Sequence, residues 1–247
     1  MPPFISIVIP AYNEEACIGQ TITDVVTELE RLGHPWEVLV VDDGSTDRTR
    51  EIVSQRQAAE ARVTLIAAPH RGKGGAVKQG MLQASGTWRF LADADLSMPI
   101  QELSRFLPGP GVPVADILIG SREAEGAARI EEPWHRHLLG RVFNIAAQTL
   151  VVGGLSDTQC GYKLFSAEAA TTLFPLQRLD GFGFDCEILF LAHRFGFRVR
   201  EVPVTWTYRA STKVTALAGG AGFVDLLRVR WNQLAGRYPA TAGRRPA

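Results

Sequence analysis

Short apolar runs alternate with longer segments of helical periodicity along the first half of the chain. The segment from Glu14 to Arg31, which follows the first apolar run, places apolar residues three and four positions apart, as on one face of a helix. A second helix is expected from about Gly74 to Ala84. Strands that alternate with helices favour an α/β fold with a doubly wound, mostly parallel sheet. The apolar runs predict four strands, at Ile5–Ile9, Trp36–Val41, Val63–Ile66 and Trp88–Ala92.

The second half of the chain is less regular but carries the same kinds of pattern. We expect one domain over residues 1–236, with no internal repeat or low-complexity linker, and a disordered Pro/Arg-rich tail over 237–247. The patterns predict, in order, a strand, a helix, a turn followed by a helix, a late strand and an amphipathic segment, at Asp116–Gly120, Trp134–Val152, Gly181–Phe195, Arg198–Val204 and Phe223–Leu234.

Polar clusters stand at the ends of three of the four strands predicted in the first half. They are Tyr12–Glu14, Asp42–Asp43 and the acidic triplet Asp93–Asp95. Ligands of doubly wound sheets bind outside the carboxyl ends of the strands, so these clusters are expected to share one site. Two carboxylates that flank one small residue can hold a divalent cation and, through it, the phosphates of a ligand. A solvated turn is the structural alternative for the triplet, and its shared position with the other two clusters favours a nucleotide-linked substrate.

Two loops separate this chain from other nucleotide-binding classes. Gly72–Gly75 lacks the spacing of a P-loop and is interpreted as a loop whose backbone approaches the nucleotide, or as an ordinary strand-to-helix turn. After the first strand, Pro10–Glu14 stands where a dinucleotide-binding protein would carry its Gly-x-Gly-x-x-Gly turn. A dinucleotide-dependent oxidoreductase is therefore disfavoured. Asp43–Asp47 predicts a turn that starts a helix, with Ser45 or Thr46 as the N-cap residue.

Composition narrows the classes of partner. The 247 residues are 46% apolar and 21% charged with a formal net charge of zero, which argues against nucleic-acid binding. Three widely spaced cysteines predict reduced thiols in a cytoplasmic protein, and no signal peptide or 18-residue apolar segment is visible. The segment Phe223–Trp231 combines apolar residues, two arginines and a tryptophan, so it either packs on the core or lies at a membrane surface. We therefore expect at most a peripheral location at the cytoplasmic face of a membrane.

The strand-end motifs together resemble glycosyltransferase family 2. Two further strings, Gly120–Arg122 and Asp157–Phe165, with Trp206, Ser211 and Lys213, resemble its dolichyl-phosphate glucosyltransferase and mannosyltransferase branch, and the glucosyl type is closer. The resemblance covers roughly residues 5–230 and implies the GT-A fold, with a nucleotide-binding half over 1–97 and an acceptor half over 98–236. The motifs that carry the family resemblance are Ile9–Glu15, Val41–Asp47, Gly72–Val77 and Asp93–Ser97.

The resemblance implies a site for a nucleotide sugar, either UDP-glucose, which is favoured, or GDP-mannose. Asp93 and Ala94 would face the ribose and diphosphate. Asp95 would bind Mg²⁺ or Mn²⁺ with Asp93, and Ser97 stands where many mannosyl relatives have a glutamine ligand. The other residues implied to contact the nucleotide or its diphosphate are Pro10, Tyr12, Glu14, Val41, Asp43, Lys73, Arg209 and Lys213.

The implied acceptor is dolichyl or polyprenyl phosphate, which receives the hexose with inversion. Arg122 and Arg136 would hold its phosphate, because the planar guanidinium donates two parallel hydrogen bonds to phosphate oxygens. A phosphate monoester is largely dianionic at neutral pH and needs no general base. Asp185 could orient the sugar or acceptor, act as base for a hydroxyl acceptor, or complement the helix dipole. Alternatives are the same fold acting on a saccharide or another alcohol, and a nucleotide-sugar-binding protein without turnover.

Overall fold

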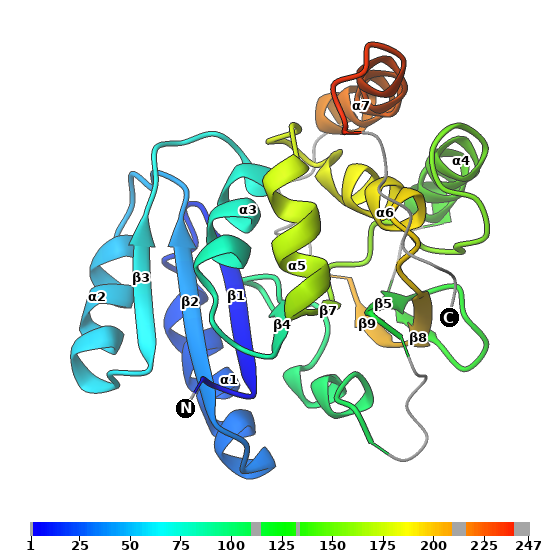
Figure 1. The fold of residues 1–247 in the computed structure, drawn as a ribbon. Helices are drawn as coiled ribbons and strands as arrows, with labels where there is room; N and C mark the ends of the chain where they lie inside the picture. Colours follow the sequence, from blue (N-terminus) through cyan, green and yellow to red (C-terminus); the bar gives the residue numbers. More distant parts are fainter. Residues whose placement is uncertain (1, 110–114, 132–133, 209–215, 240–247) are drawn as a thin grey trace.

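The computed structural model of the chain describes residues 2–109, 115–131, 134–208 and 216–239. Within these ranges a seven-stranded sheet runs through both halves of the chain (Figure 1). Its pairings are parallel except at the one strand that joins β4 to β5. The strands in spatial order are β3 (Val63–Ala67), β2 (Trp36–Asp42), β1 (Ile5–Ala11), β4 (Trp88–Leu91), β7 (Lys163–Ser166), β5 (Ile117–Ser121) and β8 (Val199–Pro203). This is the mostly parallel α/β sheet that the sequence predicts.

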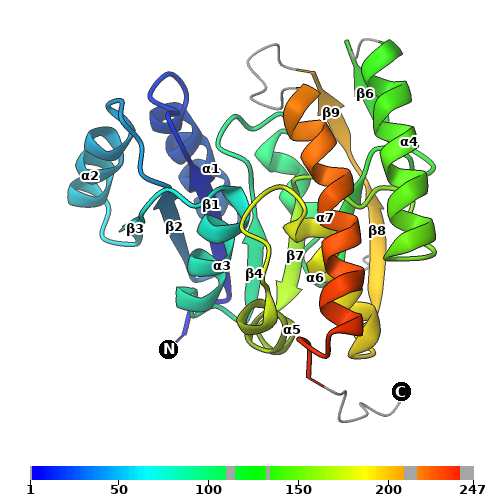
Figure 2. The same ribbon diagram turned by 90° about the horizontal axis from the view of Figure 1, so that it is seen from above.

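Helices cover both faces of this sheet. The helices, with two short 3₁₀ segments at Ile100–Arg105 and Phe174–Leu176, are α1 (Ile18–Leu32), α2 (Thr49–Ala59), α3 (Lys73–Gln83), α4 (Trp134–Leu150), α5 (Ala167–Leu173), α6 (Phe184–Arg194) and α7 (Ala216–Leu234). Figures 1 and 2 show α4 and α7 next to each other beyond α6. None of the described helices is both long and apolar enough to cross a membrane.

Alternation along β1 explains the two cores. Ile7 and Ile9 point to one face and join a cluster that includes Ile22 of α1, whereas Val8 points to the other face and joins a cluster with Val77 of α3. Every residue of β1 is buried, as expected for a central strand covered on both faces. The sheet therefore holds its carboxyl-terminal loops on a rigid frame.

Strand β7 is the main departure from the predicted topology. It is antiparallel to both β4 and β5, between which it lies. The sequence marks this stretch only as part of the motif Asp157–Phe165, because a strand of four residues that begins with Lys163 has no clear apolar pattern. A second sheet, formed by β6 (Ala128–Ile130) and β9 (Thr205–Thr207), was not predicted either, since each strand has only three residues.

Two local predictions are corrected. Neither Ser45 nor Thr46 caps α2, because that helix begins at Thr49, and Asp47 Oδ1 accepts the Thr49 amide hydrogen at 2.9 Å. The disordered tail was predicted to begin at 237, but Tyr238 is buried and its hydroxyl donates to Glu187 Oε1 at 2.6 Å. The structure thus follows the packed chain to Pro239, and residues 240–247 lie outside the described ranges.

Candidate active site

The loops after β1 and β2 are bound to each other. The Asn13 amide donates to Ser45 Oγ at 2.9 Å, and Asn13 Oδ1 accepts the Thr46 amide hydrogen at 2.8 Å. The Glu14 amide donates to Thr49 Oγ1 at 2.7 Å. Asn13 has φ 54°, a left-handed conformation that asparagine tolerates better than most residues. The polar residues that follow the first two strands are therefore brought together, as predicted, with Tyr12 and Glu14 partly exposed on this edge.

Asp43 organises the loop that leads into α3. Its Oδ1 and Oδ2 accept the amide hydrogens of Arg71 and Gly72, both at 2.9 Å. His70 Nδ1 lies 2.8 Å from the same carboxylate, and the His70 ring stacks on Tyr12 with centroids 4.2 Å apart. The Asp43 carboxylate is thus engaged by this loop, and its predicted contact with the nucleotide stays a prediction.

The Gly72 turn requires a residue without a side chain. Gly72 has φ 114°, and a Cβ atom there would lie 2.7 Å from the Asp180 carbonyl oxygen. Beside it, the Gly75 amide donates to that same carbonyl at 3.0 Å. This close approach aims Lys73, the first residue of α3, toward the end of β4, which supports the interpretation of the turn as part of the site.

Lys73 and Asp93 form an ion pair at the centre of the site. Lys73 Nζ lies 2.6 Å from Asp93 Oδ1. Burial alone would favour the neutral forms of both groups, but the charge of Lys73 holds the pKa of Asp93 below its ordinary value, and the carboxylates of Asp93 and Asp185 raise the pKa of Lys73. Both groups are therefore charged at neutral pH, and Asp93 is held in one orientation.

The acidic triplet supplies two carboxylates to the same edge of the sheet. Asp95 is partly exposed, and its Oδ1 accepts the Ser97 amide hydrogen at 3.0 Å. Within the described ranges, no three His, Cys, Asp or Glu side chains cluster to hold a metal ion. Mg²⁺ and Mn²⁺ are commonly held by one or two carboxylates with substrate phosphates completing the shell, so Asp93 and Asp95 fit a cation that arrives with a diphosphate. Ligation by Ser97 stays a prediction, and the Ser97 residue itself is buried.

Three other residues predicted around the nucleotide differ in what they present. Val41 is fully buried in the apolar cluster beneath α3, so its side chain does not face the strand-end loops, and its predicted contact with the nucleotide stays a prediction. Pro10 is buried within β1. Ala94 is buried as well, and its carbonyl accepts the Thr21 hydroxyl hydrogen at 2.5 Å, which fixes the backbone between the two carboxylates.

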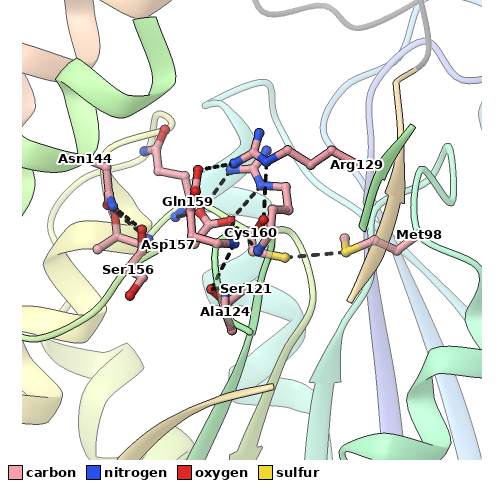
Figure 3. A network of polar contacts seen from close by, with 12 residues as sticks. Met98, Ser121, Ala124, Arg129, Asn144, Ser156, Asp157, Gln159 and Cys160 are labelled. Carbon is pink, nitrogen blue, oxygen red and sulfur yellow. Dashed lines mark hydrogen bonds and ion pairs between the residues drawn. The ribbon is translucent and has the colours of Figure 1, made fainter. Parts of the chain in front are cut away.

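Arg122 lies at the end of β5 in a bidentate ion pair with Asp157. Its Nε and Nη2 atoms lie 2.6 Å and 2.9 Å from the two Asp157 oxygens. Arg129 bonds to Glu123 and to the Arg122 carbonyl, and Figure 3 shows it entering the network from the side opposite Asn144. The Arg122 guanidinium is therefore fixed in place. The sequence predicts a phosphate contact for Arg122 but not this ion pair with Asp157.

Asp185 lies at the start of α6 and is paired with a lysine that sequence reasoning passed over. Lys163 Nζ lies 2.7 Å from Asp185 Oδ1 and also donates to the Cys160 carbonyl. Both side chains are buried, and burial raises the pKa of Asp185 above its ordinary value although Lys163 opposes that shift. Lys163 lies inside the motif Asp157–Phe165. A lysine in that mostly apolar stretch was the one sequence feature that could have indicated a buried ion pair.

The remaining predicted residues are only partly described. Arg136 belongs to the first turn of α4, and the structure does not describe its side chain. Arg209 and Lys213 lie outside the described residues. The structure places Asp93, Asp95 and Asp185 close enough to Lys73 for their charges to raise its pKa. The charge of Arg122 also lowers the pKa of Asp93.

The Arg122–Asp157 pair predicts how acid weakens the fold. Burial alone would raise the pKa of Asp157, but the charge and hydrogen bonds of Arg122 hold it at about 2. The unfolded value is about 4, so Asp157 stabilises the fold above that pH and the stabilisation fades as pH falls toward 2. Between about pH 6 and about pH 3, the unfolding free energy of the wild type is expected to fall by about 1 kcal/mol more than that of Asp157→Asn. Urea unfolding at both pH values measures this.

The matched control is Asp24→Asn, because Asp24 lies on α1, away from Arg122, and accepts a local hydrogen bond from Gln20 of the same helix. We expect this variant to keep the wild-type dependence of stability on pH. Identical pH dependence in Asp157→Asn and wild type would contradict the stabilising role given to the pair.

Comparisons with known proteins place this geometry in a family context. A family model described as Glycosyl transferase family 2 matches residues 6–174. The chain is 31% identical over 255 residues to a dolichyl-phosphate beta-glucosyltransferase of Dictyostelium discoideum, which covers 94% of this chain and 76% of that protein. It is 30% identical over 249 residues to the dolichyl-phosphate beta-glucosyltransferase of Homo sapiens, covering 95% of this chain and 77% of the human protein.

A solved structure shares the fold. Glucosyl-3-phosphoglycerate synthase from Mycobacterium tuberculosis, in complex with Mn²⁺, UDP and glucosyl-3-phosphoglycerate, matches with a TM-score of 0.62 and 22% identity, over 96% of this chain and 81% of that one. At this identity the likeness establishes the fold alone. It agrees with the mostly parallel sheet and with helices on both of its faces.

Proposed function

The chain belongs to glycosyl transferase family 2 and is a glycosyltransferase, and we propose that it transfers a hexose, with glucose favoured, from a nucleoside diphosphate to a polyprenyl phosphate. The names of the relatives support both the sugar and the lipid acceptor. The observation that carries the proposal is the Lys73–Asp93 pair at the end of β4, with Asp95 beside it and Arg122 at the end of β5. Carboxylates suited to a cation and an arginine suited to a phosphate thus lie at one edge of the sheet.

The donor diphosphate is assigned to the first half, over residues 1–97. Asp93 and Asp95 would hold Mg²⁺ or Mn²⁺, and the Mn²⁺ and UDP in the synthase complex of the same fold support that assignment. When bound, the ion stabilises the negative charge that develops on the leaving nucleoside diphosphate. Lys73 keeps Asp93 ionised and oriented, and the Gly72 turn holds Lys73 in place.

The acceptor phosphate is assigned to the second half, over residues 98–236. One of its oxygens attacks the anomeric carbon from the side opposite the diphosphate, the carbon–oxygen bond to the diphosphate breaks, and the sugar configuration inverts. A dianionic phosphate needs no base. Asp185 is buried and its carboxylate is already engaged by Lys163 at 2.7 Å, so it is not open to a substrate hydroxyl. This pairing favours the phosphate acceptor and leaves Asp185 an orienting role.

A lipid acceptor also implies a place of action. We propose that the protein works as a peripheral protein at the cytoplasmic face of a membrane, where a nucleotide sugar and a polyprenyl phosphate can meet. The lipid named for the relatives supports this location.

Transfer of radiolabel from UDP-glucose and, in parallel, GDP-mannose into organic-extractable lipid tests the function. The assay contains added polyprenyl phosphate with Mg²⁺ or Mn²⁺. We expect label in the lipid phase from UDP-glucose, and its loss on addition of EDTA. Label from GDP-mannose alone would overturn the glucose assignment, and label in soluble alcohols but not in lipid would overturn the acceptor.

Arg122→Ala tests the acceptor site separately from the donor site. We expect at least a hundredfold loss of transfer while UDP-glucose binds within about threefold of wild type, because a charged hydrogen bond to phosphate contributes about 1.5–3 kcal/mol each. Titration calorimetry measures donor binding. Arg200→Ala, at an exposed arginine on β8, is the matched control and should keep full transfer. Equal loss of donor binding and transfer in Arg122→Ala would contradict the assignment.

A further inference from the structure

Helix α4 carries a stripe of exposed apolar side chains. Trp134, Leu138, Val142 and Ile145 follow one another at spacings of four, four and three residues, so they lie along one side of the helix. Trp134 is 77% exposed and Ile145 59% exposed. The opposite side of α4 is the one that enters the core, through the fully buried Ala147.

Helix α7 repeats this arrangement. Val224, Leu227, Trp231 and Leu234 recur at spacings of three, four and three residues, and Trp231 is 63% exposed. On its inner side, α7 buries apolar residues such as Val229 in the same core cluster that receives α4. Most of the exposed large apolar side chains in the described part of the chain lie on these two helices.

The two stripes belong to neighbouring elements. The Phe143 and Phe223 rings meet edge to face with centroids 5.2 Å apart, and Figure 2 shows α4 and α7 side by side. Since both inner sides enter one core cluster, both stripes point away from the sheet. We call the eight exposed residues the α4–α7 face: Trp134, Leu138, Val142, Ile145, Val224, Leu227, Trp231 and Leu234. A contiguous apolar surface that is rimmed by polar residues marks an interaction site.

The charge of these helices selects the partner. Together they contain four arginines and one acidic residue, although the whole chain has no net charge. The single acidic residue, Asp225, is buried, whereas its partner Arg228 is 64% exposed, and Arg141 is also exposed. Arginines that flank an apolar stripe with tryptophans complement anionic lipid headgroups above an apolar layer.

We propose that the α4–α7 face docks on an anionic lipid bilayer, with Trp231 and the leucines of both helices entering the interfacial layer. This inference rests on the proposed function, because a lipid acceptor requires the enzyme to reach a membrane surface. A second copy of the chain is a poorer occupant, since a self-complementary pairing of this face would bring its arginines together.

The docking face is connected to the acceptor site through α4. Asn144, on the same helix, donates to the Ser156 carbonyl, and its Oδ1 accepts the Thr158 hydroxyl hydrogen at 3.2 Å (Figure 3). Between these two residues stands Asp157, which fixes Arg122. One helix, about 10 Å across, therefore separates the docked surface from the arginine assigned to the lipid phosphate.

Vesicle sedimentation of point variants tests the docking face. Leu138→Glu and Leu227→Glu are each expected to reduce partitioning onto vesicles of phosphatidylcholine and phosphatidylglycerol at least tenfold, because each places a carboxylate in the interfacial layer. Both sites are exposed, so the fold should be kept, and circular dichroism checks this. Leu82→Glu, at an equally apolar residue 44% exposed on α3, is the matched control and should bind as wild type.

Brominated lipids and a soluble acceptor supply the other readouts. Bromine on the upper acyl carbons should quench Trp231 fluorescence, measured as the difference between wild type and Trp231→Phe. Leu227→Glu should retain transfer to a short, water-soluble isoprenyl phosphate while losing transfer to long polyprenyl phosphate in vesicles. Vesicle binding without transfer to any polyprenyl phosphate would overturn the proposed acceptor and leave the docking face standing.

Two results would overturn the docking face itself. One is unchanged vesicle binding in Leu138→Glu and Leu227→Glu. The other is a wild-type dimer that ignores vesicles and that Leu227→Glu converts to monomer, which would assign the face to self-association. Sedimentation equilibrium distinguishes the second result from membrane docking.

Discussion

Replacing Asp95 with asparagine is expected to lower hexose transfer at least a thousandfold while the protein stays folded. Asp93 is already engaged by Lys73 at 2.6 Å, so Asp95 is the carboxylate of the pair that remains for strong ligation of a cation. A thousandfold loss corresponds to about 4 kcal/mol of transition-state stabilisation, a size that charge stabilisation by a metal site can supply. Asparagine preserves the shape and can still accept the Ser97 amide hydrogen that Asp95 accepts at 3.0 Å.

Two measurements and a control variant separate the predicted loss from a structural effect. Single-turnover transfer with saturating UDP-glucose reports the chemical step, and electron paramagnetic resonance of free Mn²⁺ reports binding of the ion in the presence of UDP. Asp95→Asn should weaken Mn²⁺ binding and transfer together, whereas Asp24→Asn on α1 should change neither. Transfer within tenfold of wild type in Asp95→Asn would remove Asp95 from the metal site.

The sequence predicts those residues of the site whose positions follow from the local pattern of apolar and polar residues. Apolar runs bounded by polar residues place Tyr12, Asp43, Asp93 and Asp95 at strand ends, and parallel strands bring their carboxyl ends to one edge. The structure confirms the sheet and its helical layers. The contact of Lys73 with the nucleotide was implied by the resemblance, through the motif Gly72–Val77.

The part that the sequence did not predict depends on contacts between distant residues. The Arg122–Asp157 pair joins positions 35 residues apart, and the Lys163–Asp185 pair joins β7 to α6. Periodicity reports which side of an element is apolar, but it says nothing of which buried charges meet. The reversed direction of β7 was hidden for the same reason, because its partners β4 and β5 lie far away in the chain.

The corrected residues show tertiary packing overriding a local signal. Ser45 and Thr46 have the side chains of helix caps, yet Ser45 Oγ accepts the Asn13 amide hydrogen and the Thr46 hydroxyl donates to Asn13 Oδ1. Tyr238 follows a stretch that reads as an exposed end, yet it fills a buried position beside Glu187. In both places the partner belongs to another element, so no local window of sequence contains it.

Gly161→Ala is expected to reduce transfer at least a hundredfold by moving Asp93. A Cβ atom at position 161 would lie 2.0 Å from Asp93 Oδ2, closer than any real contact, so the carboxylate must rotate away. Rotation breaks its pair with Lys73 and displaces the oxygen assigned to the cation. The strand and the helices around it need not shift, so we expect the stability to change by about 1 kcal/mol, which is small beside the effect on transfer.

The control for this prediction is another glycine-to-alanine change on the same chain. A Cβ atom at Gly153 would meet nothing within 4 Å, so Gly153→Ala should transfer hexose as wild type does. Transfer rate, Mn²⁺ affinity and urea unfolding are measured for both variants. A Gly161→Ala protein that transfers within threefold of wild type would mean that Asp93 acts from another orientation than the one Lys73 holds. Loss of transfer with full stability would instead tie catalysis to the position of a single carboxylate, because the methyl group adds no charge and removes no hydrogen bond of its own.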